Sequence, residues 1–420
     1  MEKKVLNYIL DNWEKSTIRD NPDVPFPYNA PSVEHFADFY YWDLYFINKG
    51  LLLSNMPEQA ENNVKNMEYF INTIGYVPNS SNKVDCRGLM YKRSQPPVFP
   101  LCVWDLYCFK KDENIIRRYI EAIIKEHDFF YKRRMTEVGL HSFMCDDLTH
   151  TYKEILGDFN PNQVHDDRVF DYGKTKEEQY QINRDLIAMS ESGLDFNARF
   201  KTSTKRMASS EFAHLDLNCW LYADEIKIAK MLDIIGEHDR ANEFKALAEN
   251  RKSLMKKYFY DNGIYKDYHL KDGKHSEVIT AVNIYPFAFG ISNNKEECLN
   301  ILRQLEFDCG VAAGAYREDD TIYHQWDYPV MWGETTFVIY LALINVGAKE
   351  DAKRIANKYM KVVEKQFDST GFFWEKYDAR DGSIMNVEYA APHFLGWTAS
   401  TYQIFATQKV DSLESFIPII

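Results

Sequence analysis

The sequence predicts an all-α fold, a single (α/α)6 barrel in which six inner helices form a closed ring inside six outer ones. Three observations lead to this expectation. Apolar residues recur mostly with helical spacing, about twelve such segments fit into 420 residues, and strand signals are few and short. A superhelical array of helix pairs would give the same helix count, but the chain has no strict repeat of about 34 to 45 residues.

The clearest apolar stripe lies in 349–367, where Ala352, Ile355, Ala356 and Tyr359 continue one face of a helix. A short β-hairpin is expected in 258–268, because Asn-Gly is a typical two-residue turn. In chain order, helices are expected over 42–53, 59–73, 96–109, 115–131, 177–189, 215–232, 240–259, 278–287 (the weakest), 294–305, 330–344, 349–367 and 392–407.

Long loops separate some of these helices. We expect one domain over 1–420 with a loop insertion at about 136–176, and a functional site built on the loops, since loops on a rigid scaffold commonly carry function. The insertion is rich in aspartate and is expected to be a solvated segment or lid. Calcium binding is an alternative, although the spacing of a calcium-binding loop is absent. The long loops are 74–95, 136–176, 191–211, 306–329 and 368–392.

The composition narrows the possible partners and the compartment. A formal net charge of −13 argues against nucleic acid and against anionic membrane surfaces. No apolar run reaches the roughly 18 residues of a membrane-spanning helix, and the apolar stretch VLNYIL near the N-terminus is too short for a secretory signal. The seven cysteines form no CxxC pair, so free thiols and a cytoplasmic location are expected. The oligomeric state stays open.

Several catalytic motifs are absent from the sequence. It has no HExxH, no zinc-type Cys/His spacing, no GxGxxG, no phosphate-binding GxxxxGK[ST] loop and no GxSxG elbow. We therefore expect neither a metal nor a cofactor.

Carboxylates set among aromatic residues are the remaining chemical signal. Apolar walls raise a carboxyl pKa, which produces a proton donor, and glycosidases pair such an acid with a second carboxylate. The aromatic share of 15% also suits sugar binding, because sugar rings lie flat on aromatic faces. The clusters are YYWDLYF with Asp43, ESGLDFNARF with Glu191 and Asp195, QWDYPVMWGE with Asp327 and Glu334, GFFWEKYD with Glu375 and Asp378, and NVEYAAPHFLGWT with Glu388.

These segments resemble, in order, motifs of the trehalase family of inverting glycosidases, which form (α/α)6 barrels. The resemblance runs from about residue 40 to about residue 407. YYWDLYF is similar to the family's YYWDSYF, YVPNSSN and KRSQPP to its IPNGxR and RSQPP, ESGLDFNARF to ESGWDFSSRW, DLNCWLY to DLN-x-x-LY, YHQWDYPVMW to QWDxPxxW, WEKYD to VEKYD, and EYAAPHFLGWT to the EY–GWT segment.

The resemblance implies that Asp195 is the general acid and Glu388 the general base that activates water, while Glu191 orients the loop. Inversion requires the two carboxyl groups to lie roughly 6.5–9.5 Å apart. It also implies that Trp42, Asp43, Asn79, Arg93, Gln95 and Asp327 hold the non-reducing sugar, with Trp326 and Trp397 as walls.

The chain departs from the family pattern around the leaving group. Ala37 stands where the family has an arginine, 175–185 lacks a PRPES-like segment, and the glycine-rich loop before Glu388 is absent. ESGLD and FLGWT also resemble segments of the related hydrolases that cut mannosylglycerate, glucosylglycerate or oligosaccharide α-glucosides.

The expected substrate is therefore a small α-glucoside, first α,α-trehalose. The alternatives are glucosylglycerate, mannosylglycerate or another α-glycoside, and a sugar-binding protein without turnover. A helical scaffold for protein partners is disfavoured, because it would show exposed apolar ridges. Three basic residues after the acid loop are interpreted either as contacts for an acidic aglycone or as a solvated edge; they are Lys201, Lys205 and Arg206.

Overall fold

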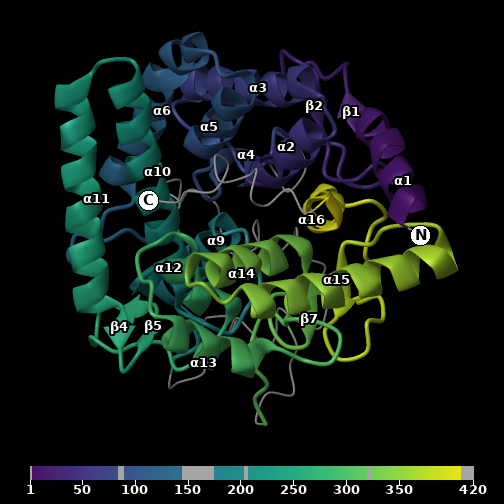
Figure 1. Cartoon of the computed structure of the whole chain (residues 1–420). Helices are drawn as coiled ribbons and strands as arrows, with labels where there is room; N and C mark the ends of the chain where they lie inside the picture. Colours follow the sequence, from purple (N-terminus) through teal and green to yellow (C-terminus); the bar gives the residue numbers. More distant parts are fainter. Residues whose placement is uncertain (1, 84–88, 144–174, 203–206, 319–323, 408–420) are drawn as a thin grey trace.

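The computed structural model describes residues 2–83, 89–143, 175–202, 207–318 and 324–407. Six helical units form an inner ring, each packed on the next, and the last packs on the first (Figure 1). This closure confirms the (α/α)6 barrel and rules out an open superhelix. The inner units are α2 (Asp43–Leu53), α5 (Phe99–Lys110), α10 (Leu215–Ile234), η3 (Ala281–Ile284) with α12 (Tyr285–Ala288), α14 (Gly333–Asn345) and α16 (Gly396–Thr407).

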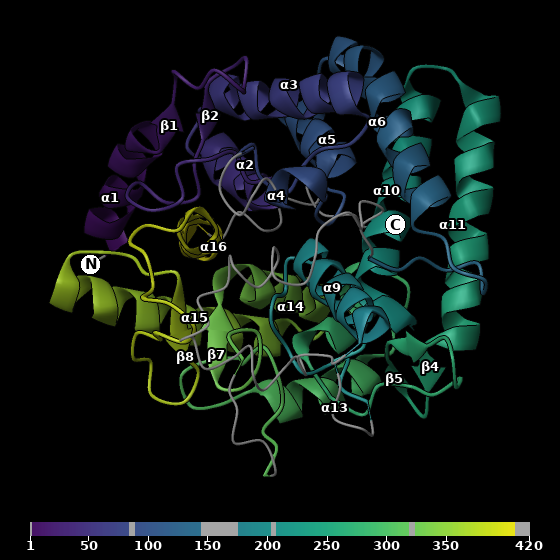
Figure 2. The same ribbon diagram turned by 180° about the vertical axis from the view of Figure 1, so that it is seen from behind.

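An outer helix lies against each inner unit, and Figure 2 shows the same double ring from behind. The two layers differ in the share of their residues that is buried. The inner helix α14 buries ten of its 13 residues, whereas the outer helix α15 buries seven of its 22 along one stripe. The outer helices are α1 (Glu2–Lys15), α3 (Pro57–Ile74), α6 (Glu113–Arg133), α11 (His238–Tyr258), α13 (Lys295–Leu305) and α15 (Lys349–Thr370).

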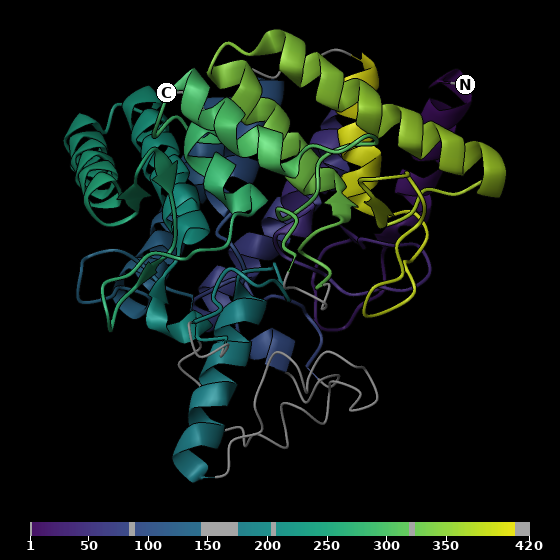
Figure 3. The same ribbon diagram turned by 90° about the horizontal axis from the view of Figure 1, so that it is seen from below.

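The twelve helices of the barrel differ from the twelve predicted ones in two places. Helix α1, which was not predicted, buries Val5, Ile9 and Trp13 and completes the outer ring beside α16. The predicted helix at 177–189 exists as α9 (Lys176–Glu191), but it projects from one end of the barrel (Figure 3). Helical spacing identifies an amphipathic helix without saying against which layer it packs.

Three expected boundaries need correction. The segment 278–287 forms a 3-10 turn followed by a single α-turn, which explains its weak helical pattern. The segment 330–344 begins as strand β7 (Val330–Trp332) before it becomes α14, and 392–407 becomes helical only at Gly396. Sequence periodicity locates the interior of a helix better than its ends.

The strands are short and occur in two-stranded antiparallel pairs. The predicted hairpin is confirmed, with Asn262 (φ 47°) and Gly263 (φ 89°) turning between β4 and β5. The pair β7/β8 places Trp332 opposite Lys376. The remaining strands are β1 (Thr17–Ile18), β2 (Tyr28–Asn29), β3 (Phe212–Ala213), β4 (Tyr260–Asp261), β5 (Ile264–Tyr265), β6 (Tyr268–His269) and β8 (Lys376–Asp378); short helices are α4 (Leu89–Lys92) and η2 (Ser209–Glu211).

The main hydrophobic core runs from Val5 in α1 to Phe405 in α16, and a smaller separate cluster contains Phe130, Phe143 and Leu217. Within the described ranges, every helix is too short or too polar to cross a bilayer. Free thiols found there are Cys102, Cys219, Cys298 and Cys309. Most of the predicted insertion, including its aspartates and the calcium alternative, lies outside the described residues.

The seam between α16 and α2 closes the ring and gives a testable prediction. A Cβ added to Gly396 would lie 2.4 Å from Cγ1 of Ile47. Gly396→Ala should therefore lower the free energy of unfolding by about 1–3 kcal/mol, measured by urea denaturation, because the core is overpacked there. In an Ile47→Ala background the same change should cost much less; equal costs in both backgrounds would contradict tight packing at this seam.

Candidate active site

The structure brings Asp195 and Glu388 together through Gln325. The backbone N–H of Gln325 donates to Oε1 of Glu388 over 3.3 Å, and its side-chain amide donates to the carbonyl oxygen of Asp195 over 2.6 Å. Both carboxylate residues are half-buried, so they combine a protein environment with access from outside. Two loops far apart in the sequence thus share one anchoring residue.

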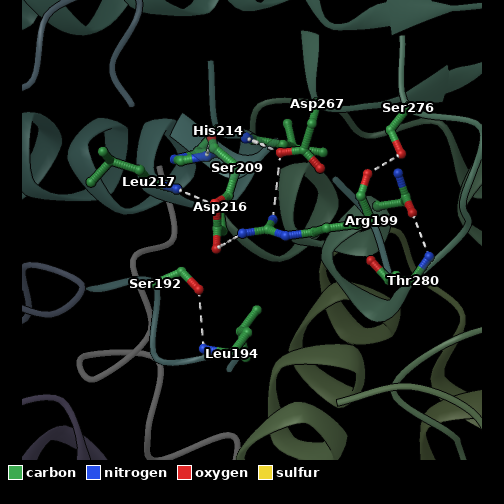
Figure 4. A network of polar contacts seen from close by, with 12 residues as sticks. Ser192, Leu194, Arg199, Ser209, His214, Asp216, Leu217, Asp267, Ser276 and Thr280 are labelled. Atoms are coloured by element: carbon green, nitrogen blue, oxygen red, sulfur yellow. Dashed lines mark hydrogen bonds and ion pairs between the residues drawn. The ribbon is translucent and has the colours of Figure 1, made fainter. Parts of the chain in front are cut away.

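The loop that carries Asp195 begins where α9 ends. Gly193 adopts φ +75°, and a Cβ there would lie 2.9 Å from the indole of Trp42, so both its conformation and its contact favour glycine. The Ser192 hydroxyl accepts a hydrogen bond from Leu194 N–H over 3.1 Å (Figure 4). After Asp195 the loop is tied again, because the carbonyl of Phe196 accepts the Trp326 N–H over 3.1 Å.

Arg199 anchors the far end of this loop to the inner ring (Figure 4). Its guanidinium is only 1% exposed and lies 2.7 Å from Oδ2 of Asp216 and 3.5 Å from Oδ1 of Asp267. Asp267 also accepts the backbone N–H of Leu215 at the start of α10 over 2.8 Å. A buried cation shared by two carboxylates is well compensated, which suits a residue that fixes a loop.

Glu191 holds its loop in position through an ion pair with Arg134. Its two carboxylate oxygens accept from Nε and Nη2 of Arg134 over 3.0 and 2.7 Å. Oε1 also accepts the Ser94 N–H over 3.2 Å. The pair is fully buried, so Glu191 joins the end of α9 to the segment that contains Arg93, in line with the role expected from the sequence.

The residue proposed as base has an unusual backbone. Glu388 has φ +68°, the left-handed region that side chains other than glycine rarely adopt. Strain of this kind persists where the surroundings hold the residue in place, and it is common at functional sites. The next residue helps to hold this segment, because the Tyr389 hydroxyl donates to Oε1 of Glu375 over 2.8 Å.

The electrostatics of the pair favour one shared proton. Burial raises the pKa of Asp195 to about 6, against the opposing effect of Arg93. Burial, reinforced by the negative charge of Asp195, raises the pKa of Glu388 to about 8. Interacting carboxyls lose their protons in two steps that belong to the pair, so one proton remains between about pH 6 and 8. One acidic and one ionised carboxyl is the state that acid–base catalysis requires.

The three tryptophans expected to line the site lie together. The ring centroids of Trp42 are 6.0 Å from Trp326 and 5.9 Å from Trp397, and those of Trp326 and Trp397 are 6.2 Å apart. Trp332, which was not predicted, stacks on Trp326 at 4.0 Å. The Nε1–H of Trp397 is buried without a hydrogen-bond partner in the described part of the chain, so a donor is available to a ligand.

The polar side of the site near Trp42 is formed by Asn79, Arg93 and Gln95. Arg93 Nη2 lies 3.5 Å from Oδ1 of Asn79, and Gln95 accepts the Trp42 N–H over 3.1 Å. Arg93 is 7% exposed, and its Nε–H is buried with no partner among the described residues. Its charge acts on Asp195, which places it near the acid.

The remaining two predicted ligands differ in their surroundings. Asp327 accepts the Ala198 N–H over 2.8 Å and an Arg317 N–H over 3.3 Å, so it already holds the acid loop. Burial raises the pKa of Asp43 well above its usual range, and the charges of Glu334 and Glu375 raise it further. Asp43 therefore belongs to a cluster of buried carboxyls at the start of α2.

Two site residues, Gln325 and Lys376, were missed in the sequence although both lie inside the segments YHQWDYPVMW and WEKYD. Lys376 donates to Oε1 of Gln325 over 2.7 Å and pairs with Glu375 at 3.1 Å. The signal that could have identified both residues is their position within these two segments. Which of their polar residues would face the acid and the base depends on the β7/β8 pairing and the path of the loops, which spacing does not reveal.

Comparison with known proteins identifies the family of the chain. The family model described as Trehalase matches residues 3–408. Periplasmic trehalase from Pseudomonas aeruginosa is 27% identical over 390 residues, covering 89% of this chain and 70% of the relative. Trehalases from Arabidopsis thaliana and Bombyx mori are each 26% identical, over 89% and 86% of this chain. The chain spans 62% and 65% of the length of those two relatives.

Solved structures agree on the fold. Neutral trehalase Nth1 from Saccharomyces cerevisiae superposes with a TM-score of 0.74 at 21% identity, covering 98% of this chain and 82% of that one. A mannosylglycerate hydrolase of family GH63 from Thermus thermophilus gives 0.65 at 14% identity, covering 97% of this chain and 100% of that one. At these identities the likeness concerns the fold. Together with the family match over residues 3–408, it shows that the chain belongs to the trehalase family.

Proposed function

We propose that this protein is an inverting α-glycosidase whose substrate is α,α-trehalose. The observation that carries the proposal is the meeting of Asp195 and Glu388 at Gln325, as two carboxyls with raised pKa values. Membership of the trehalase family and relatives named trehalase support the choice of substrate. The cleaved-sugar side of the site also keeps the polar and aromatic residues that the family motifs contain.

The proposed reaction is a single displacement. Asp195 gives its proton to the glycosidic oxygen as the bond from that oxygen to the anomeric carbon breaks. Glu388 accepts a proton from a water molecule, whose oxygen bonds to the anomeric carbon on the opposite face. One proton enters the leaving sugar and one is taken from water, so the pair returns to its starting charge, with the proton moved from Asp195 to Glu388.

The single proton belongs to the pair of carboxyls as a whole. Bound substrate puts an acceptor oxygen against Asp195 and a water against Glu388, which favours the proton on Asp195. Substrate binding is thus part of the preparation of the acid.

The sugar in the cleaved position is proposed to lie among the tryptophans and polar residues of the site. Trp42, Trp326 and Trp397 supply flat apolar faces for its C–H groups. Arg93 and the indole N–H of Trp397 supply buried donors for hydroxyl groups, and Asp43 supplies an acceptor or donor according to its protonation.

A second candidate, an α-glucoside or α-mannoside of glycerate, is favoured by the departures around the leaving group. Ala37, at the position of a family arginine, is exposed, and its carbonyl accepts the Tyr28 hydroxyl over 2.7 Å. Without that guanidinium, a leaving group smaller than glucose becomes a reasonable fit. Of the basic residues considered for an acidic aglycone, Lys201 is described, while Lys205 and Arg206 lie outside the described residues.

The proposed location is the cytoplasm. It rests on the odd number of cysteines without CxxC pairs. A fusion to a fluorescent reporter in the native cell, followed by fractionation, tests this directly.

Turnover of defined glycosides tests the function. The protein is incubated separately with α,α-trehalose, glucosylglycerate and mannosylglycerate, and released sugar is measured. We expect trehalose to be cleaved fastest and Asp195→Asn to lose about 10²–10⁴-fold in rate while still binding sugar, because only proton donation is removed. Binding of sugar by the wild-type protein with no turnover of any of the three would instead favour a sugar-binding protein.

The dependence of kcat/KM on pH should be bell-shaped, with limbs near 6 and 8. Below the lower limb both carboxyls hold protons and no base remains; above the upper limb both are ionised and no acid remains. In Asp195→Asn the carboxyl of Glu388 should titrate at a lower pH, because the neighbouring negative charge is gone, and ¹³C NMR of that carboxyl measures this. A rate that stays level from pH 5 to 10 would contradict the shared proton.

A further inference from the structure

Lys376 is a buried cation beside the acid and the base, and the proposed mechanism does not use it. Its side chain is 0% exposed and lies on β8, opposite Trp332 of β7. Its Nζ is 2.7 Å from Oε1 of Gln325, 3.1 Å from Oε2 of Glu375 and 3.7 Å from the ring centroid of Tyr389. A lysine fully removed from water needs such compensation, and here each contact belongs to a segment next to the reaction site.

The set of contacts matches an ammonium group. A charged lysine has three N–H donors and no acceptor. Around Nζ stand an amide oxygen, a carboxylate oxygen and an aromatic face, and all three attract positive charge. Burial lowers the pKa of Lys376, and the negative charge of Glu375 opposes that effect.

Gln325 uses all of its polar groups in this arrangement. Its side-chain oxygen accepts from Lys376 and its side-chain nitrogen donates to the Asp195 carbonyl. Its backbone N–H donates to Glu388 and its carbonyl accepts the Trp332 Nε1–H over 2.7 Å. The hydrogen bond from Lys376 fixes which end of the amide is oxygen, so the nitrogen must face the acid loop.

We propose that Lys376 is a positioning residue, which orients Gln325 so that it holds the acid and base loops in register and supplies the positive charge that keeps a single proton on Asp195 and Glu388. The inference rests on the proposed glycosidase function. It assigns no contact between Lys376 and the substrate.

Several charged or titratable groups surround Lys376 and determine the effect of its charge. Glu375 and Tyr389 contact it directly, and the charges of Glu388 and Asp195 act on it. Arg93 is the other cation that acts on the acid. Because Lys376 stabilises the ionised form of both carboxyls, its removal should raise both of their pKa values.

The test is Lys376→Met, which keeps an unbranched side chain of nearly the same length and removes its charge. We expect kcat to fall by about 10²-fold with KM changed much less, because misplaced catalytic groups affect the reaction more than sugar binding. We also expect both limbs of the pH profile to move upward by about 1 unit.

Lys49→Met is a matched control. Lys49 is also buried, pairs with a carboxylate, Asp105, at 2.6 Å and lies 4.2 Å from the ring centroid of Tyr45. Its loss should destabilise the fold comparably and leave the pH limbs in place. Gln325→Leu removes the orienting contact but keeps the lysine charge, so kcat should fall about 10²-fold while the limbs stay near 6 and 8.

The outcomes separate this inference from the proposed function. If the wild-type protein hydrolyses a glycoside and Lys376→Met matches it in kcat and pH limbs, the positioning role is wrong and the glycosidase stands. If the wild type hydrolyses none, ¹³C titration of the Asp195 and Glu388 carboxyls still decides: raised pKa values in Lys376→Met support the inference, and unchanged values overturn it. If Lys376→Met does not fold, a wild-type kcat in Gln325→Leu overturns it.

Discussion

The hydrogen bonds of Gln325 are the constraint on which the site depends. One loop leaves α9 with Asp195 and another follows β8 with Glu388, and neither contacts the other through regular secondary structure. The side-chain amide and the backbone of Gln325 join them, the backbone of Phe196 beside Asp195 also acts on the Glu388 carboxyl, and the stacked Trp326 and Trp332 fix the segment that carries Gln325. The barrel supplies a rigid ring, and the chemistry is set by how the loops on one end are tied together.

The structure also buries charged side chains, and two of its loops are fixed by buried ion pairs. Glu191 meets the guanidinium of Arg134, and Arg199 lies between Asp216 and Asp267. These ion pairs fix loops. Burial raises the pKa values of Asp195 and Glu388, as it also does at Asp267. The catalytic candidates are therefore distinguished by their position on the two loops that Gln325 joins, together with those raised pKa values.

Much of the fold followed from the sequence, since apolar stripes such as that of α15 depend only on local spacing. Helix α1 is not among the predicted helices, because VLNYIL was tested only as a secretory segment, although Val5, Ile9 and Trp13 follow one helical face. The spacing of α9 predicts a barrel helix, and the helix instead projects from one end of the barrel, because amphipathicity does not reveal the partner of a helix. Closure of the ring requires contact between α2 and α16, at opposite ends of the chain, and spacing says nothing about such contacts.

The candidate site was predictable to the extent that its residues stand in recognisable segments. Those segments predict Asp195 and Glu388, and the structure brings the two residues together. They do not predict that Gln325 joins them. Gln325 and Lys376 act through a side-chain amide and a strand pairing whose geometry only the folded chain defines. The raised backbone energy at Glu388 is likewise invisible in a sequence.

The stereochemistry of the first product tests the central claim most directly. Proton NMR of a fresh trehalose digest, recorded before the sugars mutarotate, distinguishes the anomers of the released glucose. A water activated by Glu388 and striking opposite the departing oxygen predicts β-glucose from the cleaved residue, in equal amount to α-glucose from the leaving residue. Release of α-glucose alone would contradict a single displacement between these two carboxyls.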